Sequence, residues 1–589
     1  MSFFDFNEEK SIGEVRGVDT NQIVINVSSS KKLLLAKVGH LVAVQGQDSN
    51  EWLIGMINRV WRDAVVSSFI ETEDIEEITQ EDFENNSVKI TLVGTFLEKY
   101  GLKKNYFTRA ILSLPDINRE VFSLDQKNLE KFMSIIANSG LKQLHNPLEI
   151  GHYALDKKAK AFLDANKLFQ RHAALLGSTG SGKSWTVASL LEQAQRLEKA
   201  NILLFDLHGE YNELPNMEQY RVAGPGDLIN GSENTLFLPF WLLTFEELQS
   251  LIIDHSEQTA PNQLAAILEA LTELKKESLI KDNKSDVLER FTIDSPIPFT
   301  VGELIEKLEE KNNYKIETGT DTKGNPKYKQ GPLYDKLTRL IIRLKSKVED
   351  RRYGFLFQYP QEYSSYESLH QIAESLLGHG AIENYRKSGI KVIDFSEVPS
   401  DVLPIIISLV ARLIYQIQFW ADAGENNDLR HPVLLICDEA HLYLPSSSES
   451  INVIQKKSVQ TFERIAKEGR KYGVGLFIVS QRPSDVSTTI LSQCNNIISL
   501  RLTNDKDKSV VKSLLPDTLE GLLSVLSGLE IGEAVVVGDS TLLPTRIVLN
   551  KPNTPPKSAT IDFWDRWTEA KEGYSIIDAV ENLRKQSRN

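Results

Sequence analysis

The chain has 589 residues, of which 41% are hydrophobic and 25% charged, and its 67 Lys and Arg against 81 Asp and Glu give a formal net charge of −14. This length exceeds what one hydrophobic core usually serves, so it predicts two to four structural units, and the composition excludes disordered and fibrous proteins. The two cysteines, Cys437 and Cys494, lack the number and spacing of a disulfide framework or a zinc site.

The start of the chain predicts no export signal. Met1–Lys10 lacks the basic start and the apolar stretch of a signal peptide. No uninterrupted apolar run approaches the roughly 20 residues that span a bilayer. We therefore expect a cytoplasmic protein without a membrane partner.

Residues 1–147 have the pattern of a small β domain. Short apolar runs alternate with turn-prone residues at regular spacing, which is typical of a small barrel or sandwich. Within them Glu71–Glu84 carries eight carboxylates in fourteen residues, which predicts a solvated acidic loop. The expected strands are Gln22–Val27, Leu41–Val44, Trp52–Val60 and Val88–Phe96.

From about residue 148 the pattern becomes that of an α/β protein. Short apolar runs, each followed by turn residues or a helical stretch, predict buried parallel strands. Between Phe245 and Lys387 the sequence is charged and helix-like, as in Leu264–Lys276 and Leu333–Glu349, which predicts a largely helical insertion. Inside it Thr318–Gln330 has the Gly, Pro and polar density of a loop or β-turn, with a mobile, partner-facing element as the alternative. The expected buried strands are Ala173–Leu176, Ile202–Phe205, Lys391–Phe395, Val433–Cys437 and Leu476–Val479.

The end of the chain has a third pattern. A Pro-rich linker after Pro552 leads into an aromatic helix that starts near Ile561, and such a tail can strap onto a neighbouring subunit. The predicted organisation is a barrel at 1–147, an α/β core at 148–550 with a helical insertion at about 245–387, and a tail at 551–589.

The most specific motif is a phosphate-binding loop that directly follows the apolar strand ending at Leu176. Its glycines let the backbone curl so that successive N–H groups face phosphates, and the next helix adds a partial positive charge at its N-terminus. Lys183 is expected to reach the β- and γ-phosphates of ATP, and Ser184 to hold Mg²⁺. A Gly/Ser-rich turn that matches by chance is the alternative. The nucleotide-binding candidates are Gly177, Ser178, Thr179, Gly180, Ser181, Gly182, Lys183, Ser184 and Trp185.

A second half of such a site follows the apolar run His431–Cys437. Asp438 has the position of the carboxylate that organises Mg²⁺, and Glu439 that of the group that orients or activates water. An ordinary strand that ends in two acidic residues is the alternative. The presence of both halves in one chain favours the catalytic interpretation.

Two further positions are catalytic candidates. Gln481 follows the strand Gly475–Val479 and is placed to sense the γ-phosphate or position water, although such an amide can also be purely structural. Arg470 ends a basic helix and is a candidate arginine finger that acts on a neighbouring subunit, with Arg464 and Lys467 as substitutes. Cations at a helix C-terminus are also expected for dipole reasons alone.

Taken together, these motifs resemble the HerA branch of the HerA/FtsK superfamily. The segment Asp206–Tyr211, DLHGEY, fills the family's position after the second core strand, so that Asp206, His208 and Glu210 become weaker site candidates. An Asp and a Glu there can alternatively cap a helix. Ser11–Val18, Val38–Val44 and Ile54–Ile57 resemble the family's N-terminal barrel. The resemblance implies a RecA-like P-loop ATPase core with an N-terminal small β-barrel.

The resemblance also implies partners and cofactors. These are a homohexameric ring with ATP and Mg²⁺ between subunits, double-stranded DNA in the central channel, and a nuclease docked on one face. Bacterial relatives of this size often belong to antiviral defence systems, with a nuclease or a sirtuin-type NAD hydrolase as effector. The acidic total charge does not oppose DNA, because only the channel of a ring has to be positive.

Two alternative functions stay open, and a third is disfavoured. One is a ring scaffold that ATP switches to activate a partner enzyme, and another is a DNA end-processing motor in repair. A membrane-associated DNA pump is disfavoured because no spanning segment is expected.

Overall fold

The structure is a computed structural model that describes residues 3–7, 10–64, 84–98, 105–124, 126–139, 148–154, 156–230, 234–320, 326–378, 389–422, 424, 429–446, 452–514, 525–541, 543–558, 563–568 and 575–586. The predicted acidic loop before residue 84 lies outside these residues. The chain divides into two compact units. The first comprises residues 1–193, 478–484 and 491–553, and the second comprises 194–477, 485–490 and 554–589.

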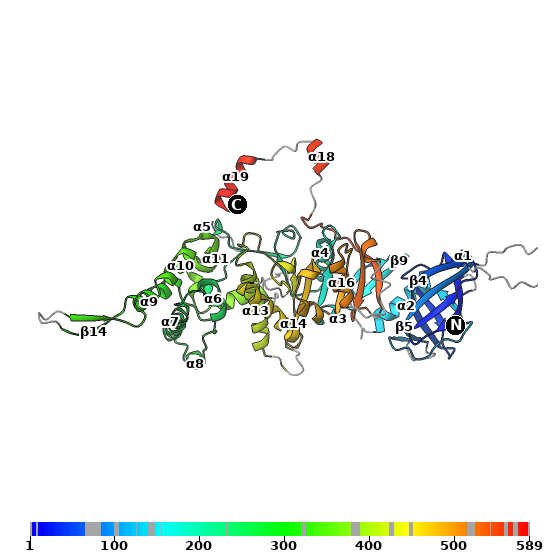
Figure 1. The fold of residues 1–589 in the computed structure, drawn as a ribbon, viewed down its shortest axis with the longest axis horizontal. Helices are drawn as coiled ribbons and strands as arrows, with labels where there is room; N and C mark the ends of the chain where they lie inside the picture. The colour runs from blue at the N-terminus through cyan, green and yellow to red at the C-terminus, as the bar shows by residue number, and fades with distance from the viewer. Residues whose placement is uncertain are drawn as a thin grey trace, which may run out of the picture. The chain divides into compact units, whose positions relative to one another are not determined.

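The first unit begins with a closed antiparallel barrel (Figure 1). Six strands run in the order β2-β1-β7-β3-β4-β5, and pairing of β2 with β5 closes the sheet, while β6 adds to the other part of β5. The barrel or sandwich predicted from strand spacing is therefore a barrel. The elements are β1 Ser11–Val18, β2 Gln22–Asn26, α1 Ser30–Leu33, β3 Leu41–Gln45, β4 Glu51–Ala64, β5 Glu84–Leu97, β6 Tyr106–Thr108, β7 Glu120–Ser123 and α2 Gln126–Ser139.

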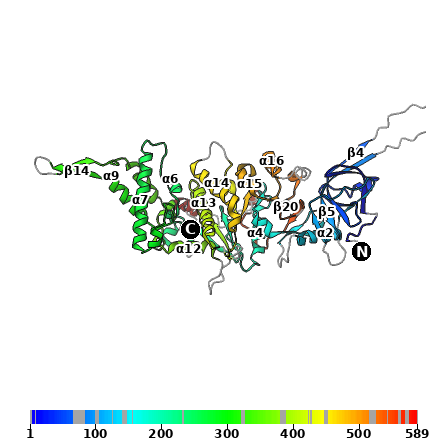
Figure 2. The ribbon, with the colours of Figure 1, turned by 90° about the horizontal axis from the view of Figure 1, so that it is seen from below.

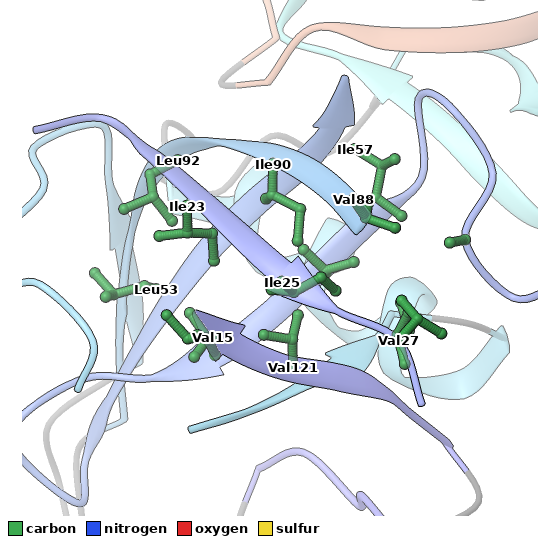
Figure 3. Close-up of a cluster of buried hydrophobic side chains, with 14 residues drawn as sticks. Val15, Ile23, Ile25, Val27, Leu53, Ile57, Val88, Ile90, Leu92 and Val121 are labelled. Atoms are coloured by element: carbon green, nitrogen blue, oxygen red, sulfur yellow. The ribbon is translucent and has the colours of Figure 1, made fainter. Parts of the chain in front are cut away.

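Alternation of apolar and polar residues builds the interior of this barrel. Every second side chain of a strand points to the same face, so Ile23 and Ile25 of β2 meet Val88 and Ile90 of β5 inside. Figure 3 shows these side chains converging with Val15, Leu53, Ile57 and Val121.

The rest of the first unit is a mixed sheet. The strands run in the order β18-β10-β19-β20-β21-β8-β9, with β10 and β19 parallel and the remaining printed pairs from β19 to β9 antiparallel. The parallel pairing of β10 with β19 confirms the prediction of parallel strands. The antiparallel pairs that follow β19 were not predicted. The elements are β8 Leu148–Tyr153, β9 Asp156–Leu163, α3 Ala165–Gln170, β10 Ala173–Leu176, α4 Lys183–Ala194, β18 Val474–Ser480, α15 Thr488–Gln493, β19 Asn496–Ser499, α16 Asp505–Ser513, β20 Glu533–Gly538 and β21 Thr545–Leu549.

The second unit holds buried strands in the order β13-β12-β16-β11-β17-β18, where β18 contributes residues to both units. β11 pairs in parallel with β16 and β17, as the apolar runs predicted. The predicted bounds of β17 coincide with the observed ones, while those of β11 and β16 differ by one residue, at one end in β11 and at both ends in β16. The elements are β11 Ile202–Asp206, β12 Glu218–Val222, α5 Asp227–Asn230, β13 Thr235–Leu236, β16 Ile390–Asp394, α13 Leu403–Trp420, β17 Val433–Cys437 and α14 Val453–Glu468.

The predicted insertion is largely helical (Figure 2). One prediction needs correction: Thr318–Gln330 is not a simple loop, because β14 and β15 pair there as an antiparallel hairpin, while residues 321–325 lie outside the described part. The elements are α6 Phe245–Ile252, α7 Ala260–Lys281, α8 Ser285–Leu288, α9 Val301–Asn313, β14 Lys315–Thr320, β15 Pro326–Gln330, α10 Thr338–Glu349, α11 Gly354–Phe357 and α12 Ser368–Leu377.

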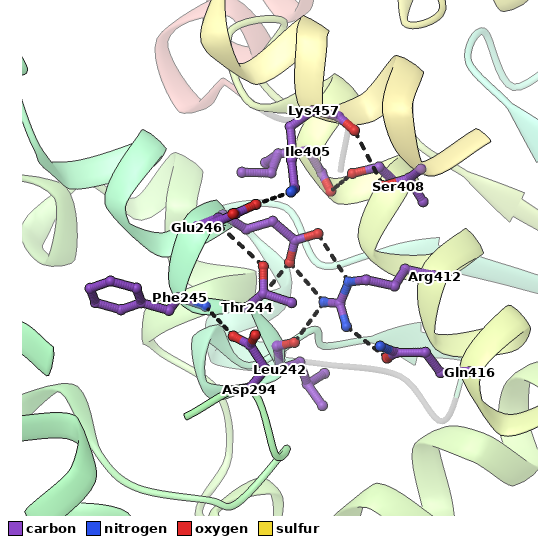
Figure 4. A network of polar contacts seen from close by, with 12 residues as sticks. Leu242, Thr244, Phe245, Glu246, Asp294, Ile405, Ser408, Arg412, Gln416 and Lys457 are labelled. Atoms are coloured by element: carbon purple, nitrogen blue, oxygen red, sulfur yellow. Dashed lines mark hydrogen bonds and ion pairs between the residues drawn. The ribbon is translucent and has the colours of Figure 1, made fainter. Parts of the chain in front are cut away.

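A buried ion pair fixes α6 of the insertion to α13 (Figure 4). Arg412 donates to both carboxylate oxygens of Glu247, at 3.0 and 2.7 Å, and also to the Leu242 carbonyl oxygen and to Gln416. Glu247 is fully buried and also accepts from the Thr244 backbone N–H in a capping box at the start of α6. All charges in this buried network therefore have partners.

α13 is long and apolar enough, by length and composition, to cross a membrane. It is the one such helix in the described residues, and Arg412 interrupts its apolar sequence. Its 18 residues have a mean hydropathy of 1.5, and 67% of them are buried inside the protein. Because Arg412 forms its ion pair from the middle of α13, the helix has the properties of a core helix.

The tail contains the predicted aromatic helix, α18 (Phe563–Thr568), followed by α19 (Ile576–Lys585). Before them, the Lys557 backbone N–H donates to the Glu210 carbonyl oxygen at 2.7 Å, and its ammonium pairs with Glu213 at 2.8 Å. The linker is thus fixed beside the DLHGEY segment.

Candidate functional site

The loop from Gly177 to Gly182 joins β10 to α4 with a backbone that only glycine adopts easily. Gly180 and Gly182 have φ values of +72° and +109°. At Gly177 the constraint is space, because a Cβ would lie 2.6 Å from Ser181 Oγ and 2.7 Å from the Cβ of Leu500. Backbone conformation or lack of space therefore explains why each of these three positions is glycine, and neither explanation depends on a bound phosphate.

Backbone contacts hold this loop to the ends of two strands. The Gly177 N–H donates to the Ser480 carbonyl oxygen at the end of β18, at 3.2 Å. Ser178 donates through both its N–H and its hydroxyl to the Arg501 carbonyl oxygen, each at 2.9 Å. Contacts within the first unit therefore hold the loop in place.

The groups that the loop presents suit a polyphosphate. Lys183 is 8% exposed and its ammonium donates to the Ser178 carbonyl oxygen at 3.4 Å, a weak contact that a phosphate oxygen can replace. The Ser181 hydroxyl is buried without a hydrogen-bond partner among the described residues. Lys183 also opens the 12-residue helix α4, whose N-terminus carries partial positive charge. These residues fit ATP, with Ser184 half-buried and Trp185 37% exposed beside it.

Gln481 lies against the same loop. The Thr179 hydroxyl donates to Gln481 Oε1 at 2.5 Å, and Gln481 follows directly on β18. The structure thus brings Gln481 to the phosphate-binding loop, and its sensor role stays a prediction.

Three carboxylates gather in the second unit at the carboxyl ends of adjacent strands. Asp206 ends β11, Asp394 ends the neighbouring β16 in direct register with it, and Asp438 follows β17 on the other side. Carboxyl ends of parallel strands are the usual place for ligand-binding residues in open α/β sheets.

Asp206 organises the DLHGEY turn. Its carboxylate accepts four backbone N–H groups, those of His208 (3.1 Å), Gly209 (2.8 Å), Glu210 (3.2 Å) and Tyr211 (3.0 Å). Burial raises the pKa of Asp206 to about 6, helped by the charge of Asp394, while these N–H groups oppose the shift. No helix begins here in the described residues, so the helix-cap alternative is replaced by a turn anchor.

The last residue of that turn reaches Asp438. The Tyr211 hydroxyl donates to Asp438 Oδ2 at 3.0 Å, and both side chains are buried. Burial raises the pKa of Asp438 to about 8, and the charges of Glu439, Asp206 and Glu210 add to the shift. This surplus of negative charge favours a hard divalent cation such as Mg²⁺, but no three His, Cys, Asp or Glu side chains among the described residues converge into a complete metal site.

Glu439 has a strained backbone. Its φ of 44° and ψ of 43° are left-handed, which costs a non-glycine residue about 1–2 kcal/mol. Its N–H donates to Asp438 Oδ1 at 2.9 Å, and its carboxylate lies 3.2 Å from His441 Nδ1. Strain of this kind gathers at functional sites, where it aims a side chain.

The three finger candidates differ in their partners. Arg464 pairs with Glu468 at 3.5 Å and stacks over Tyr415, and Lys467 lies 3.7 Å from Glu463. Arg470 is exposed and forms no ion pair within the described part of the chain. Arg470 is thus the candidate whose guanidinium is available to another subunit.

The sequence did not identify all the groups around Asp438. Tyr211 was noted only as part of a motif, and Asp394, His441 and Tyr443 were not selected. Tyr443 is fully buried and donates through its hydroxyl to the Asp438 carbonyl oxygen at 3.1 Å. The position of Asp394 at the end of a buried strand was a usable signal, whereas the tyrosine contacts require the fold.

Two families match the chain. One, described as Helicase HerA, central domain, matches residues 148–414, and the other, Helicase HerA-like C-terminal, matches residues 410–560. Lys183 falls in the first match, and Asp438, Glu439, Arg470 and Gln481 fall in the second.

Curated relatives agree with these families. A DNA double-strand break repair helicase HerA of Sulfolobus acidocaldarius is 31% identical over 408 residues, which cover 68% of this chain and 69% of the relative. A probable helicase of Methanocaldococcus jannaschii is 27% identical over 522 residues, covering 87% of this chain and 86% of the relative. The solved VirB4 of Thermoanaerobacter pseudethanolicus shares 17% identity at a TM-score of 0.44, covering 69% of this chain and 97% of that one.

Proposed function

Because the chain belongs to the HerA helicase family, we propose that it forms a homohexameric ring whose subunits hydrolyse ATP to move double-stranded DNA. The chain is an ATPase of the translocase and helicase type with a RecA-like core. The ring, the duplex substrate and the individual residue roles are the proposal.

One observation carries the proposal: the shape of the phosphate-binding loop. Its left-handed glycines and its strand contacts are in place, the Ser181 hydroxyl has no partner among the described residues, and the Lys183 ammonium lies 3.4 Å from the Ser178 carbonyl oxygen. Donors held in place in this way support the binding of a ligand rich in acceptor oxygens.

The roles of the other residues follow from their chemistry. Lys183 would bind the β- and γ-phosphates of ATP, and the oxygens of Ser184 and Asp438 would hold Mg²⁺. When bound, Mg²⁺ neutralises charge on the phosphates. Glu439 would orient the attacking water, and Gln481 would sense the γ-phosphate. These roles rest on the order of the motifs and on the surroundings of each residue within its own unit.

A ring places part of each ATP site on the next subunit. Arg470 would be that part, because it is exposed and its charge is not balanced by an ion pair in the described chain. An arginine supplied from a neighbour stabilises charge on the transferring phosphoryl group and makes hydrolysis depend on assembly.

The proposal extends to partners on the resemblance alone. A nuclease or a sirtuin-type NAD hydrolase would dock on the ring in the cytoplasm, and the assembly would act against phage. A repair role in processing DNA ends is supported instead by the names of the archaeal relatives. The net charge of −14 favours a second candidate, a ring scaffold that ATP switches to activate an effector.

The first experiment measures ATP hydrolysis by the purified chain with and without duplex DNA, together with its mass in solution. A hexamer whose hydrolysis rises with DNA supports the motor, and one indifferent to DNA supports the scaffold.

Glu439→Gln should bind ATP but lose turnover, and Lys183→Ala should lose binding. Normal turnover in both variants would contradict the site.

A further inference from the structure

The hairpin β14–β15 has no core of its own. Its two strands pair only with each other among the described residues, and every side chain described in them is exposed. An isolated two-stranded hairpin is marginally stable in water. The exposed Ile316 and Tyr328, at 41% and 58%, add apolar surface that water does not favour. A partner that covers the hairpin would stabilise it.

The base of the hairpin is fixed to the insertion. The Gly331 N–H donates to the Tyr314 carbonyl oxygen at 3.0 Å, directly below the last strand pair. A Cβ on Gly331 would lie 2.7 Å from that oxygen, so glycine is required for the close approach. The Lys315 ammonium lies 5.7 Å from the centre of the Tyr334 ring. The hairpin is therefore a supported arm of the insertion (Figure 1).

The charge of the hairpin is opposite to that of the chain. Its described strands carry Lys315, Lys327 and Lys329 against Glu317 alone, in a protein with a net charge of −14. Lys327 and Lys329 are two residues apart, so they lie on one face about 7 Å apart. Register places Ile316 opposite Lys329 on that face.

Three lysines elsewhere in the insertion are neutralised by carboxylates. Lys307, Lys311 and Lys345 each lie within 3.4 Å of a glutamate carboxylate. In contrast, neither Lys327 nor Lys329 forms an ion pair with any described residue. Uncompensated cations on an exposed arm, without a shaped pocket, suit a regular polyanion better than a small ligand.

We propose that the hairpin β14–β15 contacts the phosphate backbone of double-stranded DNA through Lys327 and Lys329. The inference rests on the proposed function, since duplex DNA is the polyanion that a translocase meets. Contacts of this kind carry no sequence information, which suits a motor that has to move along any sequence.

The test compares two full-length variants with the unaltered chain. Lys327→Gln/Lys329→Gln removes two positive charges from the hairpin, and Lys276→Gln/Lys281→Gln removes two from exposed positions on α7 of the same insertion. Binding of a short blunt duplex is measured by fluorescence anisotropy between about 50 and 200 mM salt. The hairpin variant should lower the slope of log affinity against log salt by about 2. The α7 variant should leave the slope unchanged.

Melting curves of both variants establish that each is folded. An unchanged salt slope in a folded hairpin variant would overturn the proposal, and so would an equal loss in the α7 variant. A change in oligomeric mass, or a lost protein partner with DNA binding intact, would also overturn it by assigning the hairpin to a protein contact. Failure of the unaltered chain to bind duplex DNA would instead refute the proposed function.

Discussion

Two tyrosine hydroxyls contact Asp438 at different atoms. Tyr211 donates to the carboxylate at 3.0 Å, whereas Tyr443 donates to the backbone carbonyl oxygen at 3.1 Å, and both rings are fully buried. The side-chain contact fixes the carboxylate rotamer, while the backbone contact fixes only the chain. Substitutions at Tyr211 and Tyr443 can therefore distinguish a role in magnesium binding from a role in stability alone.

Tyr211→Phe should raise the Mg²⁺ concentration needed for half-maximal ATP hydrolysis by about 10- to 100-fold, because a group that orients a metal ligand is removed. Tyr443→Phe removes the same hydroxyl from the other side and should leave the Mg²⁺ requirement unchanged. Each change should cost about 1–3 kcal/mol of stability, since a buried acceptor loses its donor. Mg²⁺ titrations of ATPase activity check this. Equal Mg²⁺ requirements in the two variants would refute the orienting role.

Among single residues, the sequence identified those that belong to a motif of consecutive positions in the chain. Lys183 and Asp438 were found because strand, turn and residue type occur together in the chain, and the glycines of the loop have the conformations that the motif requires. Tyr211 contacts Asp438 across 227 positions of sequence, so its partner was not predictable without the fold. The left-handed backbone of Glu439 likewise has no local sequence signal.

At the scale of elements, the ion pair of Arg412 and Glu247 joins α6 to α13 (Figure 4). Arg412→Met should leave the fully buried Glu247 carboxylate without its cation, which costs about 3–5 kcal/mol. Lys345→Met removes a pair with Glu309 whose side chains are both more than a third exposed, and it should cost less than about 1 kcal/mol. Hydrogen exchange checks the difference, because protection of α6 should fall in the first variant alone. Unchanged protection of α6 in Arg412→Met would show that apolar packing suffices.

The elements that sequence predicted well are those with one dominant pattern. Apolar runs located β10, β11, β16, β17 and β18, because a strand buried on both faces is apolar throughout. The hairpin at Thr318–Gln330 was assigned to a loop because its strands are polar and exposed on both faces, which leaves no alternation to detect. The antiparallel pairing of β19 with β20 depends on contacts that composition does not encode.

At the scale of the whole molecule, the acidic charge and a DNA substrate are compatible if positive groups are confined to particular places. The hairpin lysines are one such place, with a net charge of +2 in their described strands against −14 for the chain. Because salt screens exposed charges beyond about 10 Å, the local surplus matters more at the strand than the distant acidic surface does.

The proposed role of Arg470 can be tested in rings assembled from two different variants. If Arg470 completes the ATP site of a neighbouring subunit, Arg470→Ala rings should lose about 10³- to 10⁵-fold in hydrolysis, and Lys183→Ala rings should be equally inactive. Mixing the two before assembly should restore activity, since roughly a quarter of random interfaces combine an intact loop with an intact arginine. Mixing Lys183→Ala with Glu439→Gln is the control and should restore nothing, because both changes disable a subunit's own site. An inactive first mixture, in rings shown by mass to have exchanged subunits, would remove Arg470 from the role.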